Sequence, residues 1–169
     1  MILRNARSDD ETRLESFDLG VDRSPWLEEV AEIVSGLVAW RDDAEHLPLD
    51  RQVVIADDDG EIVAVAAHER VAHERLGPLS EHRYLMVVAV RADHRRSGIA
   101  RVLTESVFTE MQRDGVRTVG WLIHPANLAS IAFSQAVFAE ADETYPPEDR
   151  PYARFVVNLE SASASERRC

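Results

Sequence analysis

The sequence contains no lysine, so all 19 of its basic residues are arginine. Without lysine, the chain cannot form a Walker A nucleotide site or a Schiff base, and it has no lysine to act as a general base. Its one cysteine, Cys169, is the last residue, which excludes an internal disulfide and makes a poor nucleophile candidate. No apolar run approaches the roughly 20 residues of a membrane-spanning helix, and the polar N-terminal stretch is unlike a secretory signal. We therefore expect a cytoplasmic protein with no membrane partner.

Positive charge is scarce overall, because the formal net charge of the chain is −12 at pH 7. Nucleic-acid binding needs a basic surface that displaces counterions, so this balance disfavours a nucleic-acid-binding module built on residues 94–101. The charge is compatible with a cationic substrate, although acidic surfaces more often serve solubility. The hydrophobic share of 45% is typical of a globular protein. We expect one domain over residues 1–160 and a disordered tail over residues 161–169.

Hydrophobic periodicity and turn residues divide the chain into strands and helices. Ser24 is a good N-cap for a helix, and Asp59-Gly60 is a dipeptide that suits a tight hairpin turn. The apolar strand at 83–90 is expected at the centre of the sheet, covered on both faces. The other predicted strands occupy residues 2–5, both arms of a hairpin over 51–72, 116–123 and the two sides of a proline-rich loop within 141–159. The predicted helices occupy residues 24–40, 99 to about 115, and 128–140, which together indicate an α/β fold with a mixed sheet.

The stretch from Val90 to Glu105 concentrates arginine in an acidic chain. A predicted strand ends at Val90, and a predicted helix begins at about Ile99 after the loop "RADHRRSG". A helix N-terminus offers unpaired N–H groups and the positive end of the helix dipole, and Gly98 allows a ligand to approach the backbone closely. The junction therefore predicts a pyrophosphate site, the alternative being a surface loop with solvated arginines.

The same stretch resembles a signature of the GNAT superfamily of acyl-CoA N-acyltransferases. "RRSGIA", residues 95–100, matches the pattern [RQ]-x-x-G-x-[GA], and "VVAVRADHRR" before it is similar to the family's fourth strand. "WLIHPAN" is similar to the end of the family's fifth strand, and "NLASIAFSQAVF" to the helix that follows. The resemblance implies a GNAT-like α/β fold: a mixed, mostly antiparallel sheet flanked by about four helices. The strands at 83–90 and 116–123 would be parallel and splayed around the cofactor.

The resemblance also implies an activity, a cofactor and roles for individual residues. The chain would transfer an acetyl group from acetyl-CoA to a primary amine by direct attack, the acceptor being a small-molecule amine or an amine of a protein or peptide. The backbone of three strand residues would bind the pantetheine arm: Val88, Ala89 and Val90. The pyrophosphate would lie on the loop and the helix start: Arg95, Arg96, Ser97, Gly98, Ile99 and Ala100. Asn127 would bind the arm or cap its helix, and both roles are compatible.

The chain departs from the family pattern where the chemistry would occur. Ser134 occupies a position at which the family often has a tyrosine that protonates the departing thiolate, and the strand at 83–90 lacks the carboxylate that some members use as general base. His124 is the first candidate for that base, since imidazole titrates near neutral pH, with a histidine that is merely packed in the sheet as the alternative. Three further candidates are Glu81, Tyr145 and Tyr152. An acyl-CoA-binding module with little activity, acting as a sensor or partner protein, is the alternative function, and a homodimer remains open.

The segment "HERVAHER" suggests a zinc site at first sight. His68 and His73 are five residues apart, whereas two ligands on one helix face are separated by four, and an odd spacing on a strand directs them to opposite faces. We therefore expect no metal.

Overall fold

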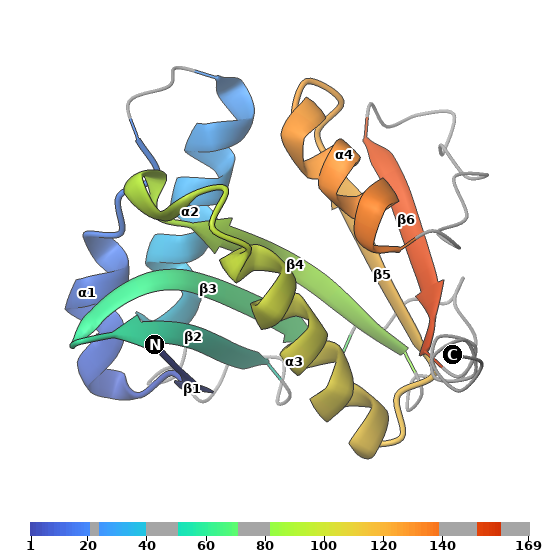
Figure 1. The fold of residues 1–169 in the computed structure, drawn as a ribbon, viewed down its shortest axis with the longest axis horizontal. Helices are drawn as coiled ribbons and strands as arrows, with labels where there is room; N and C mark the ends of the chain where they lie inside the picture. The colour runs from blue at the N-terminus through green and yellow to red at the C-terminus, as the bar shows by residue number, and fades with distance from the viewer. Residues whose placement is uncertain (21–23, 40–50, 71–81, 139–151, 160–169) are drawn as a thin grey trace. The chain divides into compact units, whose positions relative to one another are not determined.

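The computed structural model describes residues 1–20, 24–39, 51–70, 82–138 and 152–159 of the chain. The chain divides into two compact units: the first holds Met1–Glu69 and Leu85–Val107, and the second holds Arg70–Tyr84 and Phe108–Cys169. Six strands follow one another in the order β1 to β6, and α1 to α4 are the helices labelled in Figure 1. The mixed α/β sheet expected from the sequence is thereby confirmed. None of the described helices is long and apolar enough to cross a membrane.

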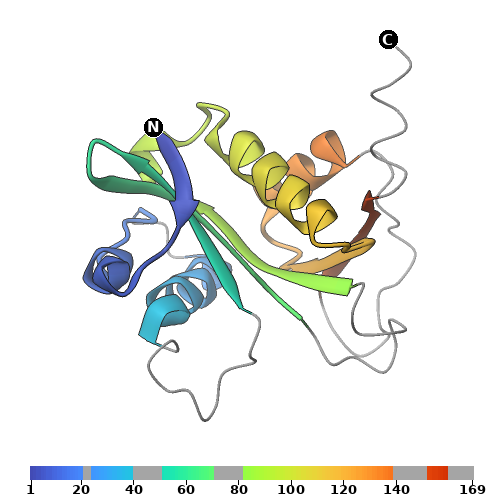
Figure 2. The same cartoon turned by 90° about the horizontal axis from the view of Figure 1, so that it is seen from below.

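The first unit contains the N-terminal strands and the helices that pack on them. Its strands are β1 (Ile2–Asn5), β2 (Gln52–Asp58), β3 (Glu61–Glu69) and the later part of β4 (His82–Val90). Its helices are η1 (Ser8–Asp10), α1 (Glu11–Glu15), α2 (Pro25–Ala39), η3 (Ala92–His94) and the start of α3 (Ile99–Arg113). In Figure 2, α1 and α2 lie on one side of β2 and β3. Sequence periodicity did not predict the short helix α1.

The hairpin between β2 and β3 has the tight turn that its sequence predicts. Asp59 and Gly60 have φ values of 50° and 88°, and two consecutive positive φ values define the turn type that matches strand twist. The strands pair antiparallel, as do β1 and β2. The prediction of this hairpin is confirmed.

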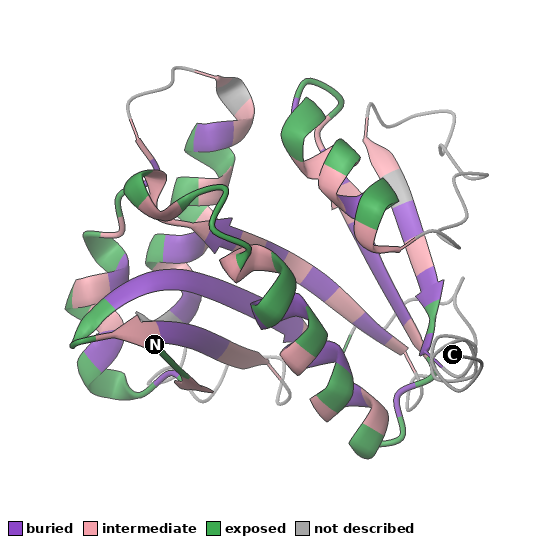
Figure 3. Ribbon diagram, in the orientation of Figure 1, coloured by how far each residue is buried: buried purple, intermediate pink, exposed green. Residues whose placement is uncertain are grey.

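The most deeply buried strand is β3, whose residues from Ile62 to His68 are all buried. In β4, by contrast, buried and half-buried residues alternate, as Figure 3 shows. The strand at 83–90 is predicted to be central and covered on both faces. It is an inner strand of the sheet, as predicted, but one of its faces is only partly covered. An apolar sequence also suits such a strand, which explains the difference. Leucine and valine side chains of α1 and α2 pack against β2, β3 and β4 in the core of this unit.

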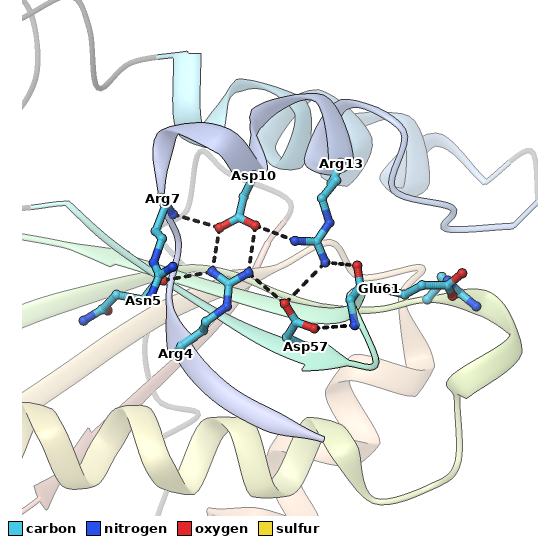
Figure 4. Close-up of polar contacts among 9 residues, drawn as sticks. Arg4, Asn5, Arg7, Asp10, Arg13, Asp57 and Glu61 are labelled. Carbon is cyan, nitrogen blue, oxygen red and sulfur yellow. Dashed lines mark hydrogen bonds and ion pairs between the residues drawn. The ribbon is translucent and has the colours of Figure 1, made fainter.

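Asp10, which ends the short helix η1, is a buried carboxylate with three partners (Figure 4). Only 1% of its surface is exposed. Arg4 donates to both of its oxygens at 2.7 and 2.9 Å, Arg13 donates at 2.7 Å, and the backbone N–H of Arg7 donates at 2.8 Å. Hydrogen bonds from Arg4, followed by that from Arg7, lower the pKa of Asp10 to about 2 against the opposing effect of burial. Asp10 is thus ionised in the folded protein at neutral pH.

The same two arginines also bind the β2–β3 hairpin. Arg4 donates to Asp57 at 2.7 Å, Arg13 approaches Asp57 at 3.4 Å, and Arg13 also donates to the carbonyl of Gly60. Asp57 in turn accepts from the N–H of Gly60 at 2.9 Å. Hydrogen bonding to Arg4 is the largest cause of the lowered pKa of Asp57. This network joins β1, α1 and the hairpin turn through ionic hydrogen bonds (Figure 4).

The second unit contains the parallel strand pair and an aromatic core. The first residues of β4 pair in parallel with β5 (Thr118–Ile123), with His82 opposite Thr118 and Tyr84 opposite Gly120. The strand β6 (Ala153–Asn158) pairs antiparallel with β5, and α4 (Leu128–Val137) follows β5 in the chain. The predicted parallel pair and the helix starting after Asn127 are confirmed. The first arm of the predicted terminal hairpin and the tail lie outside the described residues.

Replacement of Asp10 by asparagine tests the ionic network. Asp10→Asn leaves two guanidinium groups without their buried anion, so we expect the free energy of unfolding at pH 7 to fall by about 3 kcal/mol. The neighbouring Asp9 is exposed, so Asp9→Asn should change the free energy of unfolding by less than about 0.5 kcal/mol. Urea unfolding of both variants makes the comparison, and equal losses would contradict a special role for Asp10.

The pH dependence follows from the lowered pKa of Asp10. A carboxyl group that titrates at about 2 in the folded chain and at its ordinary 3.8 in the unfolded chain stabilises the fold fully above pH 4. That stabilisation, about 2 kcal/mol, is lost as the pH falls towards 2. The difference in unfolding free energy between the Asp9→Asn and Asp10→Asn variants should therefore narrow between pH 4 and pH 2. A constant difference over that range would contradict the assignment.

Candidate functional site

The loop from Arg91 to Gly98 joins β4 to α3 and contains the predicted pyrophosphate site. After η3 the backbone is extended at Arg95, and then Arg96 and Gly98 both adopt positive φ, at 64° and 85°. The hydroxyl of Ser97 donates to the carbonyl of His94 at 2.5 Å, and the carbonyl of Gly98 accepts from Val102 at 3.2 Å in the first turn of the helix. Alternating backbone conformations of this kind orient successive N–H groups towards one point.

Five consecutive backbone N–H groups are available at this junction. Among the residues that the structure describes, none accepts a hydrogen bond from the N–H groups of residues 96–100. The first N–H groups of a helix have no partner within it, and the positive end of the helix dipole lies at the same place. These residues are exposed or half-buried, so an anion can reach them.

Gly98 combines an unusual backbone conformation with open space. Its φ of +85° lies in the region that side chains disfavour, and a Cβ built at this position would meet no atom of a described residue within 4 Å. Packing against the protein therefore does not require glycine here. Backbone conformation and room for a ligand are the two remaining reasons for it.

The arginine side chains of the loop have different surroundings. Arg91 binds both oxygens of Asp93 at 2.8 Å and Glu61 at 2.5 Å, and Asp93 also lies 2.7 Å from Nδ1 of His94. These contacts, first of all that with Arg91, hold the pKa of Asp93 far below its usual range. Arg91 is thus neutralised by two carboxylates.

Arg95 and Arg96 were both expected to contact the pyrophosphate. The guanidinium of Arg95 instead donates to the carbonyl of Leu19 at 2.5 Å, with a longer contact of 3.4 Å to the carbonyl of Val90. Arg96 is exposed and forms no hydrogen bond or ion pair with a described residue, so its charge remains available to a ligand. Direct binding of an anion by either side chain stays a prediction.

Val88, Ala89 and Val90 form the end of β4 immediately before the loop. Ala89 is buried in the core of the first unit, while Val88 and Val90 are half-buried. The N–H of Arg91 donates to the carbonyl of Val63 at 2.9 Å, which fixes the end of β4 to β3. The contact of this backbone with a pantetheine arm stays a prediction.

Asn127 caps α4, as its position in the sequence indicates. Its side-chain oxygen accepts from the N–H of Ser130 at 3.1 Å, and its own N–H donates to the carbonyl of His124 at 2.8 Å. The side chain is buried, and its amide nitrogen is the group left for a ligand. The capping role is confirmed and remains compatible with the predicted ligand contact.

Ser134 has a structural environment. It is 3% exposed, and its hydroxyl oxygen accepts from the indole N–H of Trp121 at 3.1 Å. Trp121 stacks on Phe155 and meets Phe138 edge-on in the aromatic core of this unit. This geometry favours a packing role for Ser134 over the predicted role as a catalytic acid, which no direct observation tests.

His124 follows β5 directly and is half-buried. Its Nδ1 accepts from the N–H of Ala126 at 3.1 Å, and its ring meets that of Tyr152 edge-on with centroids 5.7 Å apart. A neutral imidazole has one acceptor nitrogen, so the Ala126 contact occupies the lone pair that a general base would use. Glu81, Tyr145 and His73 lie outside the described residues. Within the described ranges, no three histidine, cysteine or acidic side chains group in a way that could hold a metal ion.

Sequence reasoning missed the turn at Asp18–Gly20, which touches the loop. The carbonyl of Asp18 accepts from the N–H of Ala92 at 3.0 Å, next to the Leu19 carbonyl that Arg95 binds. No motif or periodicity marks these residues, and a glycine two positions after an aspartate is the one local indication of a turn.

The sequence of this chain matches the model of the acetyltransferase (GNAT) family over residues 11–138. The match covers most of the chain, and the protein therefore belongs to the GNAT acetyltransferase family, as its motifs predict. No match was found among curated proteins.

Solved structures of GNAT proteins have the same fold. The GNAT domain of PAT from S. lividans superposes with a TM-score of 0.70 at 22% identity, covering 92% of this chain and 89% of that one. PaiA N-acetyltransferase from Thermoplasma acidophilum, in complex with coenzyme A, gives 0.69 at 13% identity and 93% and 98% coverage. Ribosomal-protein-S18-alanine N-acetyltransferase from Escherichia coli gives 0.60 at 18% identity and 92% and 90% coverage. The GNAT-like fold predicted from the sequence is confirmed.

Removal of the Ser134 hydroxyl tests its structural role. In Ser134→Ala the buried indole N–H of Trp121 loses its acceptor, so we expect the free energy of unfolding to fall by about 1–3 kcal/mol. Ser130→Ala on the same helix should cost less, because no buried donor depends on its hydroxyl among the described residues. In a Trp121→Phe background, which has no indole N–H, the cost of Ser134→Ala should shrink. Thermal or urea unfolding of the set measures these effects, and an undiminished cost in the phenylalanine background would contradict the assigned hydrogen bond.

Proposed function

We propose that this protein is an N-acetyltransferase that transfers an acetyl group from acetyl-CoA to a primary amine by direct attack. The observation that carries the proposal is the run of available N–H groups at residues 96–100, at the N-terminus of α3. Membership of the GNAT family and the coenzyme A bound to the Thermoplasma relative support it.

The donor groups at the loop fit a pyrophosphate. Phosphate oxygens accept several hydrogen bonds at once, and backbone N–H groups at a helix N-terminus provide them without the desolvation cost of burying a cation. Gly98 leaves space beside these donors, and the exposed Arg96 adds a positive charge. We therefore assign the pyrophosphate of coenzyme A to the N–H groups of residues 96–100, with Arg96 assisting.

The remaining cofactor contacts are proposed separately for each unit. In the first unit, the backbone of Val88–Val90 would bind the pantetheine arm, because β4 leads directly into the pyrophosphate loop. In the second unit, the amide nitrogen of Asn127 would donate to the arm while its oxygen caps α4. When bound, acetyl-CoA supplies an activated acyl group as a thioester.

Free energies decide which chemical group the protein has to provide. An ordinary alkylamine with a pKa near ~10.4 must lose a proton before it attacks, which costs about 4 kcal/mol at pH ~7.5. A thiol with a pKa near ~8.5 lies only about 1.4 kcal/mol from its ionised form at that pH. An acid at position 134 that protonates the departing thiolate is therefore dispensable, whereas a base that takes the proton of the amine would lower the barrier more. His124 is the proposed base, and it would exchange the Ala126 N–H for the amine proton at Nδ1.

The same observations favour a second candidate, a module that binds acyl-CoA with little turnover. Ser134 is engaged by Trp121, and Nδ1 of His124 is engaged by Ala126, so neither group is free for chemistry in the conformation described. Thiol release from acetyl-CoA over a panel of amines, small molecules and peptides alike, separates the two candidates. Binding of coenzyme A without amine-dependent thiol release would favour the module, and a productive amine would identify the acceptor class.

Gly98→Asp tests the pyrophosphate site. The substitution puts a carboxylate beside the proposed phosphate position, so we expect it to abolish coenzyme A binding. Gly115→Asp is the matched control, because Gly115 also has positive φ and, among the described residues, nothing within 4 Å of its Cβ position. It should bind coenzyme A like the wild type despite a similar backbone cost. Calorimetry measures both affinities, and unchanged binding by Gly98→Asp would contradict the site.

Paired variants of the second unit test the division of chemical roles. We expect His124→Ala to lower kcat/KM by 10² or more, as removal of a general base does, and Ser134→Ala to keep it within about tenfold. His124→Asn separates two explanations, because its side-chain oxygen can still accept from Ala126 but cannot take up a proton at neutral pH. The kcat/KM of His124→Asn should be as low as that of His124→Ala. A fully active His124→Asn would show that His124 only stabilises the turn. Rates against pH for all three variants make the comparison.

A further inference from the structure

We propose that the turn formed by residues 18–20 positions the pyrophosphate loop, and that Gly20 and Arg95 are positioning residues for acetyl-CoA binding. The inference rests on the proposed function, since it assigns a role in a site proposed there. The turn lies between α1 and α2, more than 70 positions before the loop in the sequence.

Two hydrogen bonds fasten the loop to this turn. The N–H of Ala92 donates to the carbonyl of Asp18 at 3.0 Å, and the guanidinium of Arg95 donates to the carbonyl of Leu19 at 2.5 Å. Arg95 also reaches back towards the carbonyl of Val90 at 3.4 Å. Both ends of the segment before Arg96 are therefore held, and Arg96 is where the backbone turns to positive φ and the available N–H groups begin.

The turn is anchored to the core and braced by a hydrogen bond of its own. Leu19 is buried and belongs to the hydrophobic core of the first unit. Gly20 has a φ of +89°, and its N–H donates to the carboxylate of Asp18 at 2.7 Å. A support anchored in the core in this way can restrain a surface loop that touches it.

Gly20 packs closely against the loop, so that a side chain at this position would crowd it. A Cβ built on Gly20 would lie 3.2 Å from the Cβ of Ala92, tighter than ordinary van der Waals contact. The first residue of η3 and the turn are thus in direct contact, and a methyl group at position 20 has to displace one of them. Because binding affinity depends on donors that are already oriented, such a displacement should weaken binding of a pyrophosphate at residues 96–100.

Arg95 has two distinct ways to affect coenzyme A. As an anion contact it would act through its charge, and salt would screen that contribution. As a donor to the carbonyl of Leu19 it would act through the shape of the loop, and salt would change little. The observed hydrogen bonds assign the second role.

The first experiment compares Gly20→Ala with Gly115→Ala in the full chain. Both substitutions place a Cβ on a glycine of positive φ, but only Gly20 has a neighbour within 4 Å. We expect both variants to lose thermal stability, but only Gly20→Ala to bind coenzyme A at least tenfold more weakly. Gly20→Ala should also have a raised KM for acetyl-CoA, with kcat within about twofold of the wild type. Equal affinities in the two variants would overturn the positioning role of the turn.

The second experiment measures coenzyme A affinity at low and high salt for Arg95→Ala and Arg96→Ala. Both variants should bind more weakly, but Arg95→Ala should keep the salt dependence of the wild type, whereas Arg96→Ala should show a reduced one. A reduced salt dependence in Arg95→Ala would overturn the assignment and make Arg95 an anion contact. Failure of the wild type itself to bind coenzyme A would instead overturn the proposed function, which the binding data of the unmodified protein decide first.

Discussion

A helix cannot provide hydrogen-bond acceptors for its own first N–H groups, and the junction between β4 and α3 is built around this constraint. The positive φ values of Arg96 and Gly98 add further N–H groups to those of the helix start, and no described residue accepts from them. Unsatisfied donors are tolerated here because water or an anion can reach them. The loop is instead held by contacts that leave these N–H groups unoccupied. They come from the backbone of β3, the turn at residues 18–20 and the carboxylate of Glu61.

Arginine serves several purposes in this acidic, lysine-free chain. Arg4 and Arg13 bind a buried carboxylate and the hairpin turn, Arg91 is held by Asp93 and Glu61, and Arg95 binds backbone carbonyls. The planar, five-donor guanidinium suits such multiple contacts, which a point-charge ammonium would make less well. In the loop between β4 and α3, Arg96 is the arginine that forms no hydrogen bond or ion pair with a described residue. A cluster of arginines in a sequence is therefore a poor measure of the charge that a ligand meets.

The second unit shows how a position to which the family resemblance assigns chemistry can be used for packing. Ser134 lies in the helix that resembles the family motif, yet its hydroxyl satisfies a buried indole. Trp121 contacts both Phe138 and Phe155 around that hydrogen bond, so the serine packs at an aromatic core. The energetic argument is consistent with this use, because thiolate departure near neutral pH needs little help from an acid.

Local sequence determined the elements and the class of this protein. The Asp59-Gly60 turn, the helix after Ser24, the cap at Asn127 and the motif at residues 95–100 are encoded within a few neighbouring residues, and all correspond to elements of the structure. Tertiary structure alone decided that Asp10 is buried among arginines, that β3 is covered more completely than β4, and that Arg95 binds a carbonyl 76 positions away. Turn chemistry and helical periodicity operate over two to four residues, so sequence patterns reveal them. The partner of a long polar side chain depends on which distant segments the fold brings within 3 Å, and no local pattern contains that information.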